Sequence, residues 1–375
     1  MEKQRKINDY EVHFLMEKTL EQLREDIRAL DGDILRLLNE RAARSVEIGQ
    51  VKRSEGVDVY SPAQESRVFD FLSKHNTGPL NDAAVRDIFR EIFSSSRALQ
   101  EPLTVAYLGP EASFSHLAAL AHFGHSAELA PAGTIDQVFD RVERGNVALG
   151  IVPVENSTEG SVGHTLRRLI TTSLDIRAEV FLRISQCLMS HCLKKEEIRR
   201  VYSHPQAFAQ CRNWLRENLP QAEQLETTST SEAGARAHRD PEGGAAVGSS
   251  LLATIHGLSI LTEDIEDNPA NTTRFLVIGK GKTGRTGQDK TSILFGTPHI
   301  PGALFQALEI FARERINLLR IESHPLRDRM WEYLFFADFA GHREDEQVRL
   351  CLQDIEGRAT FLKILGSYPR GEEKT

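Results

Sequence analysis

The chain has 375 residues, of which 40% are hydrophobic, and its formal net charge is -8 at pH 7. This length exceeds one ordinary hydrophobic core, so two or three domains are expected. The acidic balance argues against general nucleic-acid binding, which needs basic surface to neutralise phosphates.

The amino-terminal segment 1–14 carries charges and lacks the apolar run of about 7 to 15 residues that a signal peptide requires. No stretch approaches the ~20 apolar residues of a membrane span. The four cysteines show neither CxxC pairing nor metal-ligand spacing with histidine, which predicts buried reduced thiols. They are Cys187, Cys192, Cys211 and Cys351. The sequence therefore predicts a cytoplasmic protein without a membrane segment.

Three helices are predicted in the first hundred residues. From Leu20 to Val51 apolar residues recur mostly in steps of three and four, which indicates one helix of ~34 residues, roughly 50 Å long. Ser61 as a cap and Pro62 in the first turn begin a second helix. The third follows the break at 78–79. One overlong member among three helices favours an intertwined homodimer or a higher homo-oligomer.

Cations on the long helix are the first candidate site. Arg41 and Lys52 are eleven residues apart and lie on one helical face, whereas Arg24 points elsewhere. The alternative is a solvated basic face. Segment 20–52, which holds these cations, resembles the first helix of the all-α chorismate mutases. The resemblance implies that Arg41 and the partner subunit's Arg24 bind the two carboxylates of chorismate.

Further mutase residues follow from the same resemblance. Lys52 and Gln100 would bind the ether oxygen or its neighbouring carboxylate, Glu65 the ring hydroxyl, and Ser96 would assist. The reaction is an intramolecular rearrangement, so fixed cations can hold a flexible dianion in its reactive shape and stabilise charge on the ether oxygen. Gln64 replaces the usual arginine and Ser61 a common aspartate. These departures leave a non-catalytic helical domain as an alternative.

From Thr104 onward, strand-like and helical runs alternate, which is typical of an α/β domain. One such strand-like run covers 178–190. No GxGxxG or Walker motif is present, so no nucleotide site is suggested, and neither a metal nor an organic cofactor is expected. Three apolar runs border polar residues, and strand ends in open α/β sheets face the ligand crevice. We therefore expect three stretches to converge on one pocket, namely 151–163, 201–210 and 267–279.

The motifs in these stretches resemble those of prephenate dehydratases. They are Glu155-Asn156-Ser157, Ser203-His204-Pro205-Gln206 and Thr273-Arg274-Phe275, in that order. The resemblance implies two α/β lobes with the active site between them and Thr273 as proton donor to the departing hydroxyl. Arg274 would clamp a carboxylate with its fork. Asn156, Ser157, Ser203 and Gln206 would supply neutral donors and acceptors.

Three residues near these motifs carry separate expectations. Glu155 faces an anionic substrate and must be protonated, paired with Arg274 or placed by the hydroxyl, and the sequence leaves these options open. His204 is expected to be structural at a helix entry. Ala112 stands where glycine is usual in a further family motif, at 109–115.

After a connector rich in glycine and lysine at 279–290, the chain reads as β, α, β, β, α, β, the ferredoxin-like plan. Fold alone leaves a structural appendage as an alternative. Two motifs, Gly302-Ala303-Leu304 and Ile321-Glu322-Ser323, resemble those of ACT regulatory domains. The resemblance implies that Gly302, Ala303, Leu304, Glu322 and Ser323 bind phenylalanine, an inhibitor, at a dimer interface. Phe305 and His324 depart from the usual pattern.

The expected domains are an all-α mutase domain at 17–100, a two-lobed α/β dehydratase domain at 103–281 and an ACT domain at 290–369. This order resembles that of the bifunctional chorismate mutase-prephenate dehydratases. It implies conversion of chorismate to prephenate and then to phenylpyruvate, with feedback inhibition by phenylalanine. Two alternatives are a dehydratase with a non-catalytic helical dimerisation domain and a phenylalanine-sensing binding protein. Activity on arogenate also stays open.

Overall fold

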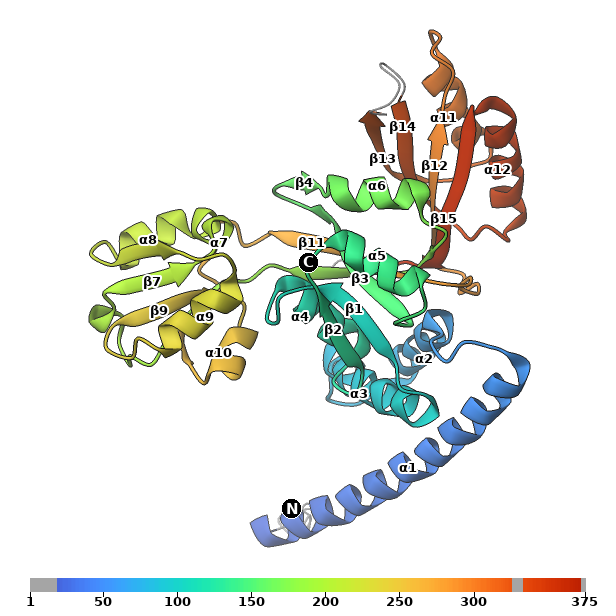
Figure 1. Ribbon diagram of the computed structural model, residues 1–375. Helices are drawn as coiled ribbons and strands as arrows, with labels where there is room; N and C mark the ends of the chain where they lie inside the picture. Colours follow the sequence, from blue (N-terminus) through green and yellow to red (C-terminus); the bar gives the residue numbers. More distant parts are fainter. Residues whose placement is uncertain (1–18, 326–332, 372–375) are drawn as a thin grey trace, which may run out of the picture. The chain divides into compact units, whose positions relative to one another are not determined.

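The computed structural model describes residues 19–325 and 333–371 (Figure 1). The segment 1–14, on which the expectation about a signal peptide rests, lies outside the described residues. The chain divides into two compact units, of which the first ends at Val57 and the second begins at Asp58.

The first unit contains the helix α1 (Leu20–Glu55), which confirms the predicted long helix. Thr19 and Gln22 form a capping box at its start, and Gly56 ends it with a φ of 66°, a conformation that glycine adopts without strain. Its apolar stripe is exposed, with Leu30 at 60% and Ile34 at 54% relative exposure. A helix of this kind gains its stability from packing against a partner.

The second unit begins with helices α2 (Pro62–His75) and α3 (Asp82–Gln100). Pro62 lies in the first turn of α2 as predicted, but Ser61 makes no side-chain capping bond. Asn81 caps α3 by accepting a hydrogen bond from the backbone of Ala84 at 2.8 Å. Tyr60, which precedes α2, packs into the core of the first α/β lobe, so these helices share a core with the domain that follows.

The first lobe is built on a mixed sheet. The strand order is β2-β1-β3-β11-β5, with β4 paired to β3. The strands are β1 (Thr104–Leu108), β2 (Glu128–Ala132), β3 (Leu149–Asn156), β4 (Gly160–Ser161), β5 (Asp175–Arg183) and β11 (Thr272–Gly279). Strands β1, β2 and β3 run parallel, whereas β11 is antiparallel to both of its neighbours. Helix α4 (Phe114–Phe123) covers one face, and α5 (Ile135–Glu143) and α6 (Gly163–Thr171) cover the other.

The second lobe has its own mixed sheet, in the order β10-β6-β9-β7-β8. Its strands are β6 (Cys187–Ser190), β7 (Arg200–Ser203), β8 (Glu223–Glu226), β9 (Gly244–Gly248) and β10 (Ser259–Thr262). Helices α7 (Pro205–Gln210) and α8 (Arg212–Asn218) pack on one face. Helices α9 (Thr230–His238) and α10 (Leu251–His256) pack on the other, and a 3-10 turn, η1, spans Lys195–Glu197.

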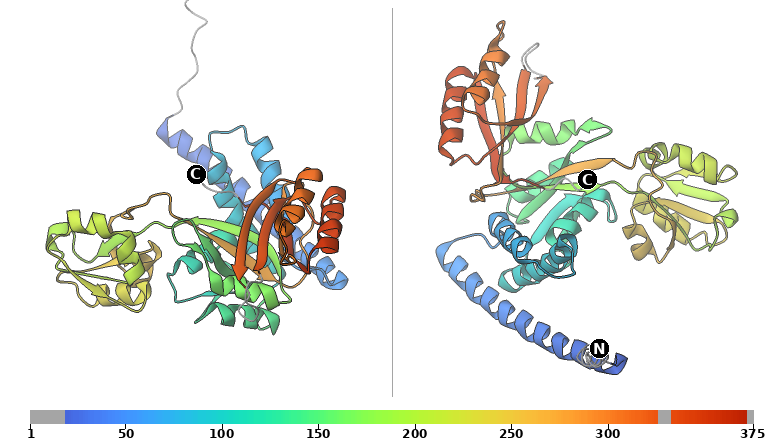
Figure 2. Two further views of the ribbon diagram at one scale, coloured as in Figure 1. Left: turned by 90° about the horizontal axis from the view of Figure 1, so that it is seen from above. Right: turned by 180° about the vertical axis from the view of Figure 1, so that it is seen from behind.

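The prediction of one continuous strand at 178–190 is wrong, because this segment contains parts of two strands that belong to different sheets. Strand β5 ends at Arg183 and β6 begins at Cys187. Between them the backbone nitrogen of Ile184 donates to the carbonyl oxygen of Asn271 at 2.8 Å. The chain thus leaves the first sheet beside the point where it returns, and Figure 2 shows the two crossings between the lobes.

The carboxyl-terminal domain confirms the predicted βαββαβ order. Its elements are β12 (Asp289–Gly296), α11 (Ala303–Arg313), β13 (Leu318–Pro325), β14 (Tyr333–Ala340), α12 (Glu346–Arg358) and β15 (Phe361–Pro369). The sheet is antiparallel in the order β13-β14-β12-β15. The fourth element of this predicted order is the strand-like run 330–341, and its first three residues lie outside the described residues. Both helices pack on one face of the sheet.

The other face of this sheet packs against the first lobe. Leu294, Leu334, Phe336 and Leu365 share one hydrophobic cluster with Leu276 of β11. Gly366 of β15 lies directly on Ile176 of β5, so that a side chain at Gly366 would collide with the backbone of Ile176. We call this contact between the two sheets the joint.

Two expectations from composition can be compared with the described residues. All four cysteines are buried, as predicted. No helix within 19–325 or 333–371 combines the length and the apolar character needed to cross a membrane.

Candidate active sites and effector site

The antiparallel pairing of β3 with β11 brings two of the predicted motifs together. Asn156 at the end of β3 pairs with Thr273 at the start of β11, and Glu155 pairs with Arg274. Antiparallel strands place the end of one beside the start of the other. Motifs more than a hundred residues apart therefore become neighbours.

The side-chain amide of Asn156 has a fixed orientation. Its Oδ1 accepts hydrogen bonds from the backbone nitrogens of Thr158 at 2.9 Å and Glu159 at 3.0 Å. Its Nδ2 donates to Thr273 Oγ1 and to Asn271 Oδ1, both at 2.8 Å. Because an amide nitrogen only donates, Thr273 Oγ1 is the acceptor and keeps its own proton for donation.

The second lobe reaches this pair of strands through α7. Gln206 Nε2 donates to both carboxylate oxygens of Glu159, at 2.6 and 2.7 Å. A second contact joins Ser249 Oγ to the carbonyl oxygen of Ala112 at 2.7 Å. Ala112 has a φ of 60°, a left-handed conformation that explains why glycine suits this position.

The two predicted serines bond to backbone groups. Ser157 Oγ accepts from the backbone nitrogen of Thr272 at 2.9 Å, which fixes the start of β11 beside the end of β3. Ser203 is fully buried, and its hydroxyl donates to the carbonyl oxygen of Val247 at 2.7 Å. The structure therefore does not bring the Ser203 hydroxyl to the other residues. His204 caps α7, in agreement with its expected structural role.

The structure does not bring Arg274 to Thr273, contrary to its expected role as a substrate clamp. Successive strand residues point to opposite faces, so the Arg274 guanidinium enters the joint. It donates to Glu179 at 2.9 Å, Asp338 at 2.6 Å and the Tyr368 hydroxyl at 3.1 Å. Arg274 is buried and its guanidinium is bonded to three protein groups, so its contacts in this structure are structural.

The charges in the joint stabilise one another. Lys290 Nζ lies 2.8 Å from Glu179, whose side chain has no exposed surface. Burial by itself would raise the pKa of Asp338, but Arg274, Ser292 and Lys290 together hold it below its ordinary value. Burial raises the pKa of the Tyr368 phenol. The network thus stays ionised at Asp338 and neutral at Tyr368 near neutral pH.

Glu155 pairs with Arg320 of β13, a partner that the three sequence-based options did not include. Arg320 Nε lies 3.1 Å from Glu155 Oε2. Arg320 also contacts Glu322 at 2.6 Å and Ser161 at 3.0 Å. Sequence reasoning missed Arg320, although its spacing of two from Glu322 places both side chains on one face of a strand. Glu159, the partner of Gln206, was missed as well.

The predicted mutase residues divide between the two units. Arg24, Arg41 and Lys52 lie on α1, where Arg24 is exposed and the others are half-buried. Burial lowers the pKa of Arg41. The second unit holds the remaining three on α2 and α3, namely Glu65, Ser96 and Gln100.

The environment on α2 and α3 includes a buried arginine that sequence reasoning missed. Arg97 forms an ion pair with Glu65 and donates to the carbonyl oxygen of Phe123 at 2.6 Å. The Oε1 atom of Gln100 is buried and has no hydrogen-bond partner among the described residues. An unsatisfied buried polar atom suits a side chain that binds a ligand.

A hollow of about 570 Å³ in the carboxyl-terminal domain contains three predicted effector residues. Gly302, Ala303 and Leu304 line it beside the aromatic rings of Phe305, Tyr333 and Phe335. Ser323 pairs with Phe335 across β13 and β14, so it belongs to the face with this hollow. Glu322 belongs to the opposite face and contacts Arg320. The two residues of this motif therefore point in different directions.

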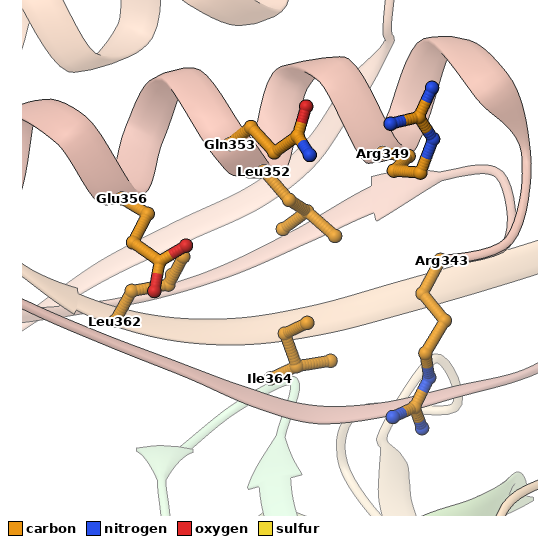
Figure 3. Close-up of a pocket in the computed structure, with 7 residues that line it drawn as sticks. All are labelled: Arg343, Arg349, Leu352, Gln353, Glu356, Leu362 and Ile364. Carbon is orange, nitrogen blue, oxygen red and sulfur yellow. The ribbon is translucent and has the colours of Figure 1, made fainter.

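A second hollow of about 420 Å³ lies between α12 and β15 (Figure 3). Arg343 and Arg349 lie at one end and Glu356 at the other, with Leu352 and Ile364 between them. This hollow contains none of the predicted residues. Among residues 19–325 and 333–371, no cluster of histidine, cysteine, aspartate or glutamate side chains is arranged to hold a metal ion.

Comparisons with known proteins match all three parts of the chain. The model of chorismate mutase type II matches residues 23–101, that of prephenate dehydratase residues 105–283, and that of the ACT domain residues 291–357. The bifunctional chorismate mutase/prephenate dehydratase of Aquifex aeolicus is 42% identical over 94% of this chain and 98% of its own length. The chain belongs to the bifunctional chorismate mutase/prephenate dehydratase family.

Other relatives agree with this membership. The bifunctional chorismate mutase/prephenate dehydratase of Stutzerimonas stutzeri is 43% identical, over 94% of this chain and 98% of its own. A crystal structure of prephenate dehydratase in complex with L-Phe from Arthrobacter aurescens has a TM-score of 0.65 and 34% identity. It covers 72% of this chain and 90% of its own. The order of helical, two-lobed and ACT folds described above is thus the order of the family.

Proposed function

We propose that this bifunctional chorismate mutase/prephenate dehydratase carries out two consecutive reactions and is inhibited by phenylalanine. It rearranges chorismate to prephenate and then dehydrates and decarboxylates prephenate to phenylpyruvate. The observation that carries the second reaction is the 2.8 Å hydrogen bond from Asn156 to Thr273 Oγ1, which leaves the threonine proton for a leaving group. A ligand sensor needs no such donor, which favours the enzyme over the sensing protein.

The dehydratase step needs one proton at one oxygen. The electron pair of the bond to the departing carboxylate enters the ring, the ring C–O bond breaks, and the leaving oxygen takes a proton and departs as water. A threonine hydroxyl is a weak acid, so it acts through a short and aligned hydrogen bond. Thr273 is 8% exposed and held by Asn156, which keeps such a bond aligned.

Substrate binding in the dehydratase is proposed for the groups around Thr273. Asn156 positions Thr273, and Gln206 joins the two lobes through Glu159. Glu155 lies on the other face of β3, where it pairs with Arg320. Arg274, Ser203 and Ser157 are left with structural roles, because their polar atoms bond to protein groups.

The mutase step is proposed for the cations of α1 together with Glu65, Ser96 and Gln100. Arg41 and the partner subunit's Arg24 would hold the two carboxylates. Lys52 and the side-chain amide nitrogen of Gln100 would donate to the ether oxygen and stabilise the charge there. The exposed stripe of α1 supports a homodimer in which a second copy of α1 covers it.

Phenylalanine is proposed to bind in the hollow lined by Gly302, Ala303 and Leu304. Its rings Phe305, Tyr333 and Phe335 suit an aromatic side chain. The solved relative with bound L-Phe supports this choice of effector. The buried thiols are compatible with the cytoplasmic location predicted from the sequence.

The test is a time course with purified protein and chorismate, in which prephenate and phenylpyruvate are followed with and without phenylalanine. Thr273→Val should lower turnover of prephenate by about 10²- to 10⁴-fold, the usual range for a lost proton donor. It should leave chorismate consumption intact.

Arg41→Ala should lower chorismate consumption by about 10²-fold or more and leave the turnover of supplied prephenate intact.

Matched controls lie close to both positions. Thr272→Val removes the hydroxyl on the opposite face of β11, and Arg36→Ala removes an exposed arginine of α1 that pairs with Asp33 and Glu40. Both should keep the two activities. Loss of both activities in folded Arg41→Ala would contradict separate sites. Consumption of supplied prephenate without consumption of chorismate would establish the dehydratase-only alternative, and the same assay with arogenate reports substrate choice.

A further inference from the structure

Arg320 of β13 is shared by carboxylates from two different domains. It contacts Glu155 of the dehydratase lobe at 3.1 Å and Glu322 of the ACT domain at 2.6 Å. Arg320 also donates a hydrogen bond to the Ser161 hydroxyl at 3.0 Å. Ser161 lies opposite Glu155 on the β3–β4 hairpin. Two carboxylates and one guanidinium leave this cluster with one negative charge in excess.

The next carboxylate along the joint has a cation of its own. Asp338 lies opposite Arg320 in the register of β13 and β14. It pairs with Arg274 at 2.6 Å and accepts from Ser292 at 2.5 Å. Arg320 therefore forms ion pairs with Glu155 and Glu322, while Arg274 forms ion pairs with Asp338 and Glu179.

The strand β13, which carries this cluster, pairs with β14, and Tyr333 and Phe335 of β14 line the effector hollow. Alternate residues of a strand face opposite sides. Arg320 and Glu322 face the joint, whereas Ser323 belongs to the face of Phe335, a ring that lines the hollow. A ligand in the hollow that shifts β13 must carry Arg320 with it, because the backbone of the strand is common to both faces.

We propose that Arg320 is a positioning residue for the dehydratase reaction and the charge that couples the effector hollow to it. Glu155 precedes Asn156, the residue that holds Thr273. With Arg320 in contact, the carboxylate of Glu155 is fixed and its charge is partly offset by the guanidinium. With Arg320 displaced, the unpaired charge of Glu155, one residue from Asn156, makes the potential at the end of β3 more negative and disfavours a dianionic substrate. This inference rests on the proposed inhibition by phenylalanine.

The first test is the steady-state turnover of prephenate by Arg320→Gln in the full-length protein. The KM for prephenate should rise about tenfold with a smaller change in kcat. The rise should shrink as salt is added, because added ions screen charge repulsion. Arg320→Lys keeps the charge and should stay within threefold of the wild-type KM. A KM rise that salt does not change, or a folded lysine variant that behaves like the glutamine variant, would overturn the positioning role.

A double variant isolates the pair. If Arg320 acts through Glu155, then Glu155→Gln combined with Arg320→Gln should have the KM of Glu155→Gln alone. Independent, additive effects would contradict the proposal. The control Arg313→Gln breaks an exposed ion pair with Asp354 on the helical face of the same domain and should match the wild type.

The coupling is tested by phenylalanine titration of the same proteins. Arg320→Gln should need at least tenfold more phenylalanine for half-inhibition, while the affinity measured by calorimetry stays within twofold. An unchanged inhibition curve would refute the coupling. Absence of phenylalanine binding to the wild type would refute the proposed effector instead, so the two failures can be told apart.

Discussion

His122 illustrates at the residue scale how burial fixes a protonation state. The side chain lies beside Tyr60, whose hydroxyl is 2.7 Å from its Nε2. Burial, together with the nearby charges of Arg97 and Arg90, lowers the pKa of His122 to about 3. The ring is therefore neutral in the folded protein at every pH at which the enzyme would work.

This depressed pKa predicts acid sensitivity. The unfolded chain begins to bind the proton near pH 6.5, whereas the folded chain does so only near pH 3. The stabilisation is complete above pH 6.5 and is lost as the pH falls, by about 1.4 kcal/mol per pH unit. The free energy of unfolding of His122→Gln, measured in urea, should depend less on pH between pH 7 and 4.5 than that of the wild type.

The control for this slope is His164→Gln, which removes an exposed histidine from α6. Its unfolding free energy should follow the wild-type dependence on pH. Equal slopes for His122→Gln and the wild type would show that another group causes the acid sensitivity.

Motif recognition predicted some residues of the candidate dehydratase site. It failed for residues whose role depends on which face of the strand the side chain occupies. It named Asn156 and Thr273, which strand pairing brings into contact. It grouped Arg274 with Thr273, but neighbours on a strand face opposite sides. Arg320 lies 165 residues from Glu155 along the chain, and only the docking of two sheets makes them partners.

At the element scale β11 serves two cores at once. Phe275 and Val277 pack on the side of α4, whereas Leu276 and Ile278 pack on the side of the ACT sheet. The strand is consequently buried on both faces, which explains its continuous apolar sequence. Any change in how the ACT sheet docks acts directly on the strand that carries Thr273.

The close approach of β15 to β5 gives a prediction for this joint. Gly366→Ala places a methyl group against the backbone of Ile176, which cannot yield like a flexible side chain. Overpacking of this kind costs about 1–3 kcal/mol. Calorimetry should show a lower unfolding temperature, and phenylalanine should inhibit prephenate turnover less.

The matched change is Gly357→Ala in α12, where an added methyl group meets nothing within 4 Å. Alanine favours a helix over glycine by about 1 kcal/mol, so this variant should be slightly more stable. Equal effects of the two substitutions would show that the joint does not depend on Gly366.

Element order was predictable where hydrophobic patterns are local. The βαββαβ plan of the ACT domain follows from its own periodicity. The break between β5 and β6 did not, because both strands are apolar and the division depends on distant partners. Gln186, for example, donates its backbone nitrogen to Glu266 at 2.8 Å. No local signal in 178–190 reports such a partner.

At the scale of the whole molecule, the exposed stripe of α1 predicts self-association. Leu30→Glu combined with Ile34→Glu should convert the proposed dimer into monomers, as measured by sedimentation velocity. Charges at the centre of a helix pair are strongly unfavourable. Mutase activity should fall with the dimer, because Arg24 is proposed to act in the partner's site, while turnover of supplied prephenate should persist.

Leu193→Glu is the matched control, since this leucine of the second lobe is 81% exposed. It should leave both the assembly state and the mutase unchanged. A monomeric wild-type protein with full mutase activity would contradict the proposed assembly.

The hydrogen bond between Ile184 and Asn271 has a mechanical consequence. The second lobe is an insertion whose two ends are fastened together at the edge of the first sheet. Tension along the chain therefore peels β5 from β11, starting at the paired residues Asp175 and Gly279, before it reaches the inserted lobe. While that pair holds, the second lobe carries no load and can rotate about its paired ends without stretching the sheet that bears Thr273.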